Sequence, residues 1–242
     1  MIFGRQRPWK FVPSPVVALL IVALALQLGL AANGPQPLAR ASDLGPPPSG
    51  PVLRMMEAFD PLPAAHLTTL YLQAFDNQPG ISIPFRDLDY QRVREWLRTA
   101  LKLDPEGQYP LLMASQLYAQ VPDPARQRFM LEFVFEQFGV DPDRRWRWMA
   151  HAAIMAKHRL HDLPMALRFA RAIAQKCTKA PAWARQMHIF LLEDLGEFEA
   201  ARILLGGLLA SGAVTDQHER LLLLERLQRL EHAENSSGPT KR

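Results

Sequence analysis

The chain has 242 residues, with 28 basic and 24 acidic side chains and a formal net charge of +4 at pH 7. Residues 1–32 hold three of the basic side chains and no acidic one, so the rest of the chain is close to neutral. A near-neutral body lacks the basic face of a nucleic-acid-binding protein, which excludes nucleic acid as the expected partner. The single cysteine, Cys177, excludes an intramolecular disulfide and a multi-cysteine metal site.

A basic N-terminus at residues 1–10 precedes an uncharged, largely apolar stretch at residues 11–32. Because roughly 20 apolar residues cross the hydrocarbon core of a bilayer, residues 11–32 are predicted to form a transmembrane signal anchor. The positive charges before the anchor place residues 1–10 in the cytoplasm and the body on the other side of the membrane. A cleaved signal peptide is the alternative, because residues 39–41 have the A-x-A form of a cleavage site.

The composition is rich in Leu, Ala, Arg and Pro, which is typical of proteins from GC-rich bacterial genomes. The expected location is therefore the bacterial inner membrane, with the C-terminal domain in the periplasm. Residues 33–54 follow the anchor and contain six prolines and three glycines. Proline removes backbone donors and stiffens an extended chain, so this segment is predicted to be a linker that spaces the body from the membrane.

Residues 55–234 are predicted to form an all-α domain, because Ala, Leu, Arg, Gln and Glu dominate and apolar residues recur at spacings of three and four. The tail at residues 235–242 is small and polar and is predicted to be disordered. Helices are expected at residues 52–58, 63–76, 87–102, 107–120, 123–138, 143–159, 163–176, 181–194, 198–210 and 216–233.

The segment Gly196–Arg202 has the features of a turn between the two helices of a helical hairpin. Gly196 can adopt the positive φ that ends one helix, because glycine has no Cβ to clash with the backbone. Spacings of 37, 36 and 35 residues separate the equivalent positions of four such hairpins, Val93, Met130, Ala166 and Ala201. A near-constant period in this range indicates stacked helix-turn-helix units.

These units resemble tetratricopeptide repeats (TPR), most closely at residues 192–202 and 100–105. The family repeats a helix-turn-helix of about 34 residues with a proline at its end, and the resemblance covers about residues 62–210. It implies an all-α fold in which helical hairpins stack as a right-handed repeat array, a TPR-like α-solenoid. It also implies that the first helix of each hairpin lines a concave inner surface that binds a partner.

The resemblance assigns a partner-binding groove to one face of the first helices. The register counted from Pro105, Pro142 and Gly196 predicts the groove residues Tyr109, Gln116, Gln120, Trp146, Met149, Lys157, Trp183, Gln186, Phe190 and Glu193. Tryptophan, tyrosine and methionine together are typical of a receptor for a peptide or a helix. Trp146 and Trp183 can equally belong to a packed core, because an insertion of two residues rotates a helical face by about 200°.

Two further segments are assigned a place in the array. Residues 216–233 are predicted to cap it, with Leu221, Leu224 and Leu227 facing the stack and the charged side chains solvated. Residues 77–87 form a long connection between two helices. This connection is either a functional loop or a segment that packs back over the first hairpin.

The chain contains no GxSxG, P-loop or GxGxxG motif. His151 and His158 lie on one helical face about two turns apart, without the i, i+4 spacing and nearby carboxylate of a helical metal site. We therefore expect no catalytic, cofactor-binding or metal-binding residues and no enzyme activity. The array is expected to act by binding.

The expected function is that of a scaffold or assembly factor of a bacterial envelope complex. It would be attached to the membrane through residues 11–32 and would bind envelope or membrane proteins. Two alternatives stay open. One is an accessory subunit of a polysaccharide or lipid export system or of a secretion system. The other is an envelope enzyme, such as a hydrolase, or a metal- or haem-binding protein that uses the region of His151 and His158.

Overall fold

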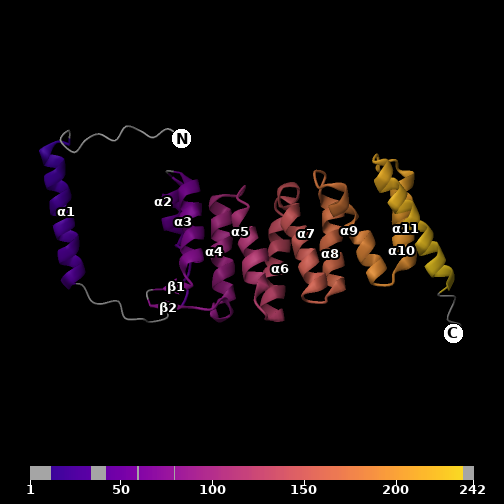
Figure 1. Ribbon diagram of the computed structural model, residues 1–242, viewed down its shortest axis with the longest axis horizontal. Helices are drawn as coiled ribbons and strands as arrows, with labels where there is room; N and C mark the ends of the chain where they lie inside the picture. The colour runs from indigo at the N-terminus through magenta and orange to yellow at the C-terminus, as the bar shows by residue number, and fades with distance from the viewer. Residues whose placement is uncertain (1–11, 34–41, 59, 79, 237–242) are drawn as a thin grey trace. The chain divides into compact units, whose positions relative to one another are not determined.

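The computed structural model describes residues 12–33, 42–58, 60–78 and 80–236, and their secondary structure is almost entirely helical (Figure 1). In these ranges two short strands, β1 (Asn77–Gln78) and β2 (Ile81–Ser82), are the only extended elements. The chain divides into an N-terminal unit that contains α1 and a body that contains the helices from α2 onward. The predicted all-α fold class is confirmed at this level.

The N-terminal unit contains α1 (Ser14–Asn33), a helix without a charged side chain. Its segment Ser14–Ala32 has a mean hydropathy of 2.4, so α1 is long and apolar enough to cross a membrane. A signal sequence passes the same test of length and composition. The basic residues 1–10 and the A-x-A motif at 39–41 lie outside the described residues, as does the tail from residue 237 onward.

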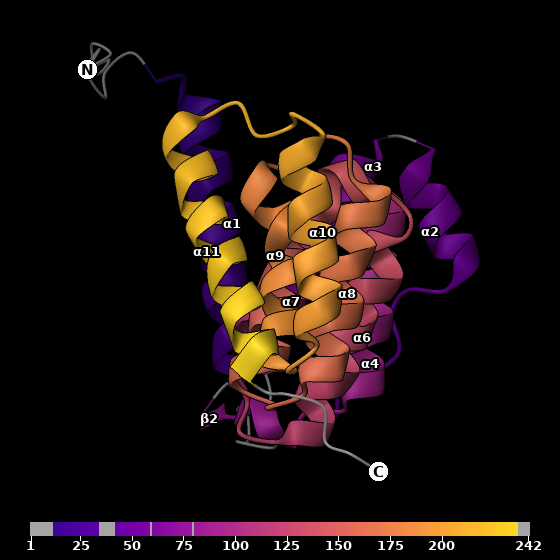
Figure 2. The ribbon, with the colours of Figure 1, turned by 90° about the vertical axis from the view of Figure 1, so that its right-hand side faces the viewer.

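The body is a succession of helices in which each packs mainly against its neighbours along the chain (Figure 1, Figure 2). The predicted helices are confirmed, with one exception at residues 107–120, and their ends lie within three residues of the expected ones. A 3-10 helix, η2 (Phe85–Asp87), precedes α4. The α-helices of the body are α2 (Gly50–Glu57), α3 (Pro61–Ala74), α4 (Tyr90–Leu103), α5 (Tyr109–Leu112), α6 (Pro124–Phe138), α7 (Pro142–His158), α8 (Leu163–Lys176), α9 (Ala182–Asp194), α10 (Phe198–Ala210) and α11 (Gln217–Ser236).

The helix expected at residues 107–120 is divided into three pieces. Helix α5 is followed by a π-helical turn, η3 (Met113–Leu117), and a 3-10 turn, η4 (Tyr118–Gln120). The hydroxyl of Ser115 donates to the carbonyl of Leu111 at 2.9 Å, and such a side-chain bond competes with the regular backbone ladder. The prediction of one continuous helix is therefore wrong here.

Six of the described helices of the body begin after an aspartate, which explains why their starts could be predicted. The carboxylates that precede α4, α6, α7 and α8 accept backbone N–H groups of the first turn at 2.8–3.3 Å. Each such N-cap stabilises a helix by ~1 kcal/mol. A proline also lies at the first or second position of α6, α7 and α8, where its missing N–H costs nothing. The caps of α4, α6, α7 and α8 are Asp89, Asp123, Asp141 and Asp162. Asp60 before α3 and Asp216 before α11 accept backbone N–H groups in the same way, at 3.0 and 2.7 Å.

The turn between α9 and α10 confirms the prediction made for Gly196. Gly196 has a φ of 78°, in the left-handed region. The N–H of Glu197 donates to the carbonyl of Leu192 at 2.9 Å, which is the wrapped hydrogen bond of a glycine-terminated helix. Helix α9 therefore ends at this glycine, and α10 begins two residues later.

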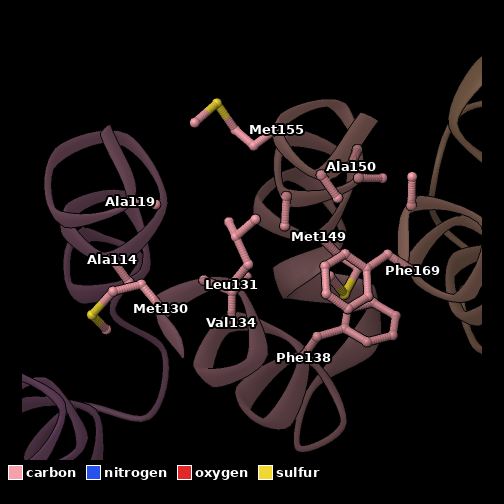
Figure 3. Close-up of a cluster of buried hydrophobic side chains, with 14 of the residues drawn as sticks. Ala114, Ala119, Met130, Leu131, Val134, Phe138, Met149, Ala150, Met155 and Phe169 are labelled. Atoms are coloured by element: carbon pink, nitrogen blue, oxygen red, sulfur yellow. The ribbon is translucent and has the colours of Figure 1, made fainter. Parts of the chain in front are cut away.

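The hydrophobic core of the body is formed by the facing sides of successive helices (Figure 3). Phe138 of α6, Met149 of α7 and Phe169 of α8 are fully buried members of one cluster. The positions that the sequence period treats as equivalent are also fully buried, which places them on the packed side of their helices. These positions are Val93, Met130, Ala166 and Ala201.

A docked segment at Ser42–Gly45, here called the strap, corrects the predicted linker at 33–54. Leu44 is buried in the main core of the body. The N–H and the hydroxyl of the first strap residue both donate to Gln78 Oε1 at 2.9 Å, and Trp96 Nε1 donates to the carbonyl of the last at 2.9 Å. Because α2 begins at residue 50, most of the expected linker that the structure describes belongs to the body.

The later part of the connection at residues 77–87, from Ser82 onward, packs back over the body. Ile83 and Phe85 are partly buried against the main core. The ring of Phe85 meets that of Tyr118 edge to face, with centroids 5.6 Å apart. Of the two roles considered for this connection, packing is the one that these contacts describe.

Helix α11 docks with a different face from the predicted one. Leu223 and Leu230 are buried, whereas Leu221 and Leu224 are exposed. Leu227 is partly buried. The helix is rotated because Glu219 and Arg226, which make the polar contacts to α9 described below, lie on its docked side. Both side chains were expected to be solvated.

Candidate functional site

The ten predicted groove residues do not form one open surface. Met149 is fully buried in the core, because α7 packs between its neighbours α6 and α8. Gln186 is also buried. Both are therefore packing residues, and their assignment to a groove is corrected.

Three of the four predicted groove residues of α9 contact α11 of the same chain. Gln186 donates to Glu219 at 3.1 Å, and Arg226 donates to Glu193 at 2.7 and 2.8 Å. The guanidinium of Arg226 also lies 4.2 Å from the centroid of the Phe190 ring. Gln186, Phe190 and Glu193 thus stabilise the C-terminal end of the body.

Two further groove residues make polar contacts between neighbouring segments. Lys157 of α7 forms an ion pair of 2.6 Å with Asp194 at the end of α9. Gln120 accepts a hydrogen bond of 3.1 Å from Arg159. Both pairs are solvent-exposed, so each contributes little to stability and either side chain can exchange its partner.

The remaining aromatic residues of the predicted groove mark the starts of α5, α7 and α9. Tyr109, Trp146 and Trp183 are separated by 37 residues each and lie in the first half of their helices. Tyr109 is 43% exposed and Trp183 is 52% exposed. The rings of Trp146 and Trp183 meet edge to face at 72°, with centroids 5.7 Å apart. The structure therefore brings two of the predicted groove residues together at the surface.

The tryptophans differ in whether their indole N–H donates to an acceptor within the chain. Trp96 donates its indole N–H to Gly45, and Trp148 donates its N–H to Gln108 at 2.6 Å. Trp146 and Trp183 make no such hydrogen bond to any part of the chain that the structure describes. A partly exposed indole that lacks an internal acceptor can donate to a ligand.

A cation accompanies the tryptophan pair. The guanidinium of Arg147 lies 5.6 Å from the centroid of the Trp146 ring, within the range of a cation–π contact. The neighbouring Arg144 is instead paired with Glu106 and Asp141. The pair formed by Trp146 and Trp183, together with Arg147, is called the tryptophan site below. It combines apolar ring surface, two N–H donors and one positive charge.

A second concave region lies beside the π-helical turn. It has a volume of about 430 Å³ and contains Gln116 and Gln120, two of the predicted groove residues. The connection at residues 77–87 contributes Phe85 and Arg86 to its wall. Both segments were considered in the sequence analysis, but their contact was not predicted. The π-helical turn η3, which orients them, could not be recognised in the sequence. This cleft can accept an apolar group flanked by amides.

The histidines of α7 do not converge on a metal site. His151 is partly buried, and burial lowers its pKa although a backbone hydrogen bond to Ser115 opposes the shift. His158 is exposed. Across the described ranges, no group of three or more His, Cys, Asp or Glu side chains could hold a metal ion. Cys177 is buried, and burial raises the pKa of its thiol to about 11.

No protein-family model matches this chain, and no curated protein or solved structure is significantly similar to it. The likeness to TPR proteins therefore depends on the residues quoted for it and on the period of the hairpins. Function has to be argued from the geometry of the sites described above.

Proposed function

We propose that this chain is a membrane-anchored scaffold or assembly factor of a bacterial envelope complex that acts by binding another protein. Helix α1 serves as an uncleaved transmembrane signal anchor, with the N-terminus in the cytoplasm and the body in the periplasm. Its length, its lack of charge and the basic residues before it support this assignment.

We further propose that the body is a right-handed, TPR-like α-solenoid. The support is that helices pack mainly on their sequence neighbours and that the equivalent positions of four hairpins, 35–37 residues apart, are buried. A hairpin of this size cannot bury both of its apolar faces alone, and stacking provides the missing contact.

The tryptophan site is the observation that carries the binding function. Tryptophan and arginine are enriched among the residues that contribute most to protein–protein binding. The exposed ring of Trp183, next to the partly buried ring of Trp146, leaves apolar surface in water unless a partner covers it. The N–H donors and Arg147 favour a partner segment that presents backbone carbonyls and a carboxylate next to an apolar side chain.

A photocrosslinking experiment tests this proposal in intact membranes. A photoreactive amino acid placed at Trp183 is expected to capture one defined protein, because Trp183 is exposed at the site. Trp183→Ala and Arg147→Glu, each with a probe at Tyr109, are expected to lower capture of that protein at least tenfold, which corresponds to about 1.4 kcal/mol.

The matched control is Leu221→Ala, which truncates another exposed apolar side chain far from the site in sequence. Capture should be unchanged in this variant, and circular dichroism should show that all variants keep their helices. Equal capture by Trp183→Ala, Arg147→Glu and the unmodified chain would remove the tryptophan site from the proposed function.

A further inference from the structure

The first two helices of the body expose an unusually apolar surface. The large apolar side chains of this surface are all at least 40% exposed, and Leu67 and Leu70 reach 61% and 57%. It is called the α2–α3 face and comprises Val52 and Met55 of α2 with Leu67 and Leu70 of α3.

The outer side of α3 forms a continuous apolar stripe. Pro63, Leu67, Leu70 and Ala74 follow one another at spacings of four, three and four, so they lie on one side of the helix. All four are exposed. Helix α3 contains no Asp, Glu, Lys or Arg, and its titratable side chains are those of His66 and Tyr71.

The inner side of α3 is already packed against the body, so the exposed stripe is not the side of the helix that belongs in the core. Its inward positions are buried, and the two threonines among them satisfy their hydroxyls within the helix. Thr68 donates to the carbonyl of Ala64 at 2.7 Å, and Thr69 donates to that of His66 at 2.8 Å. Turning the helix to bury Leu67 and Leu70 would expose these packed residues.

The last helix of the body, α11, carries charged residues on its exposed side, as expected for a helix that faces water. Helix α11 also exposes leucines, but Arg220, Glu225 and Arg229 stand between them. Terminal units of stacked helical arrays need such a polar outer face to remain soluble. The outer face of α3 lacks it, which indicates that something apolar covers α3.

The strap identifies the end of the body to which the N-terminal segment is tethered. Trp96 donates to Gly45 of the strap and stacks on Tyr71 of α3, with ring centroids 4.7 Å apart. The strap is therefore attached next to α3. Only residues 34–41 separate the strap from the end of α1.

We propose that the α2–α3 face docks on the lipid surface of the membrane in which α1 is anchored. This inference rests on the proposed anchoring of α1. The leucine, valine and methionine side chains enter the boundary between headgroups and acyl chains, and the exposed Arg54 of α2 reaches lipid phosphates. A lipid surface requires no fixed charge pattern, and the proposed anchor α1 is joined to the strap, at this end of the body, through eight residues of the chain, 34–41.

Fluorescence quenching in single-copy lipid nanodiscs tests the proposal with the full chain. The bilayer contains phosphatidylethanolamine and phosphatidylglycerol, and a nitroxide-labelled lipid and aqueous iodide serve as the two quenchers. Single fluorophores are attached at Leu70→Cys on α3, Leu222→Cys on α11 and Leu24→Cys on α1. All carry Cys177→Ser, because a serine hydroxyl can replace the thiol that donates to Pro142 at 3.3 Å.

The expected result is that the probe at position 70 is quenched several-fold more by the nitroxide lipid than the probe at 222 and is protected from iodide. Adding Leu67→Glu should restore iodide access at position 70, because it puts a charge in the centre of the face. Position 67 is exposed, so this change leaves the packed side of α3 intact.

The remaining outcomes each overturn the proposal in a distinct way. If the probe at 24 is quenched by lipid and the probe at 70 stays open to iodide, the anchor stands and the docking face is refuted. If the probe at 24 is not quenched, both the anchor and the docking are refuted. Protection of position 70 that appears only in discs with two copies would assign the face to self-association instead of lipid.

Discussion

Arg145 introduces a positive charge into the packed interior of the body. Its side chain is fully buried at the start of α7. It donates to the carbonyl of Gln137 at 2.7 Å and to that of Pro105 at 2.9 Å, and burial lowers its pKa. One guanidinium therefore satisfies the carbonyls of two segments that precede α7, and it ties the ends of successive hairpins together.

We expect Arg145→Lys to lower the free energy of unfolding by about 1–3 kcal/mol, because an ammonium group cannot reach both carbonyls and leaves one of them buried without a donor. Urea denaturation followed by circular dichroism measures the loss. The control is Arg144→Lys at the neighbouring position, whose ion pairs with Glu106 and Asp141 are exposed. If Arg145→Lys lowers the free energy of unfolding no more than Arg144→Lys does, Arg145 does not hold the two segments together.

At the scale of the helix, two glycines of one hairpin have opposite consequences. Gly196 ends α9 with a φ of 78°, so Gly196→Ala is expected to lower the free energy of unfolding by about 1–2 kcal/mol. Gly206 lies inside α10, where an added Cβ meets no heavy atom within 4 Å. Gly206→Ala is expected to raise the free energy of unfolding by about 0.5–1 kcal/mol.

Thermal and urea denaturation of the two variants measure both changes under identical conditions. Comparing Gly196→Ala with Gly206→Ala tests the role of the turn, because the same substitution is made in the turn and inside the helix of one hairpin. Equal effects of the two substitutions, in either direction, would show that the left-handed conformation of Gly196 does not decide where α9 ends.

The local signals explain why most helices could be predicted from the sequence. An aspartate followed closely by a proline favours a helix start, as it does before α6, α7 and α8, and Gly196 stops a helix for reasons within its own backbone. The strap gave no such signal. Leu44 is one apolar residue among prolines and glycines, and the strap that carries it is held by a hydrogen bond from Trp96 to Gly45, 51 residues apart in the sequence. A contact of that kind cannot be predicted from local composition.

The candidate site was predicted only in part, because a helical face depends on its neighbours. Tyr109, Trp146 and Trp183 share a period that the sequence contains, and the two tryptophans do meet at the surface. Met149 lies three residues after Trp146 but is buried by the helices on both sides of α7. The leucines of α11 allowed several docked faces, and the polar contacts of Glu219 and Arg226 to α9 selected the observed one.

At the scale of the whole body, packing between helices is local in sequence. Each helix contacts mainly the one before it and the one after it. Arginine–carboxylate pairs link alternate helices in the same stepwise way: Arg98 of α4 pairs with Glu136 of α6, and Glu132 of α6 pairs with Arg168 of α8. Stability in such an arrangement is approximately a sum of terms between neighbours, and damage at one end need not reach the other.

Hydrogen exchange with mass spectrometry can measure how far damage spreads. Leu205 is fully buried in α10, and Leu205→Ala is expected to cost about 2–5 kcal/mol because it leaves a cavity at the packed side of that helix. Backbone amides of α9, α10 and α11 should then exchange faster, while those of α4 keep their protection. The reciprocal change is Leu97→Ala, at a fully buried position of α4, which should release α3 and α4 and leave α10 protected. If either substitution accelerates exchange equally throughout the body, the helices unfold as one cooperative unit and the nearest-neighbour description of this chain is wrong.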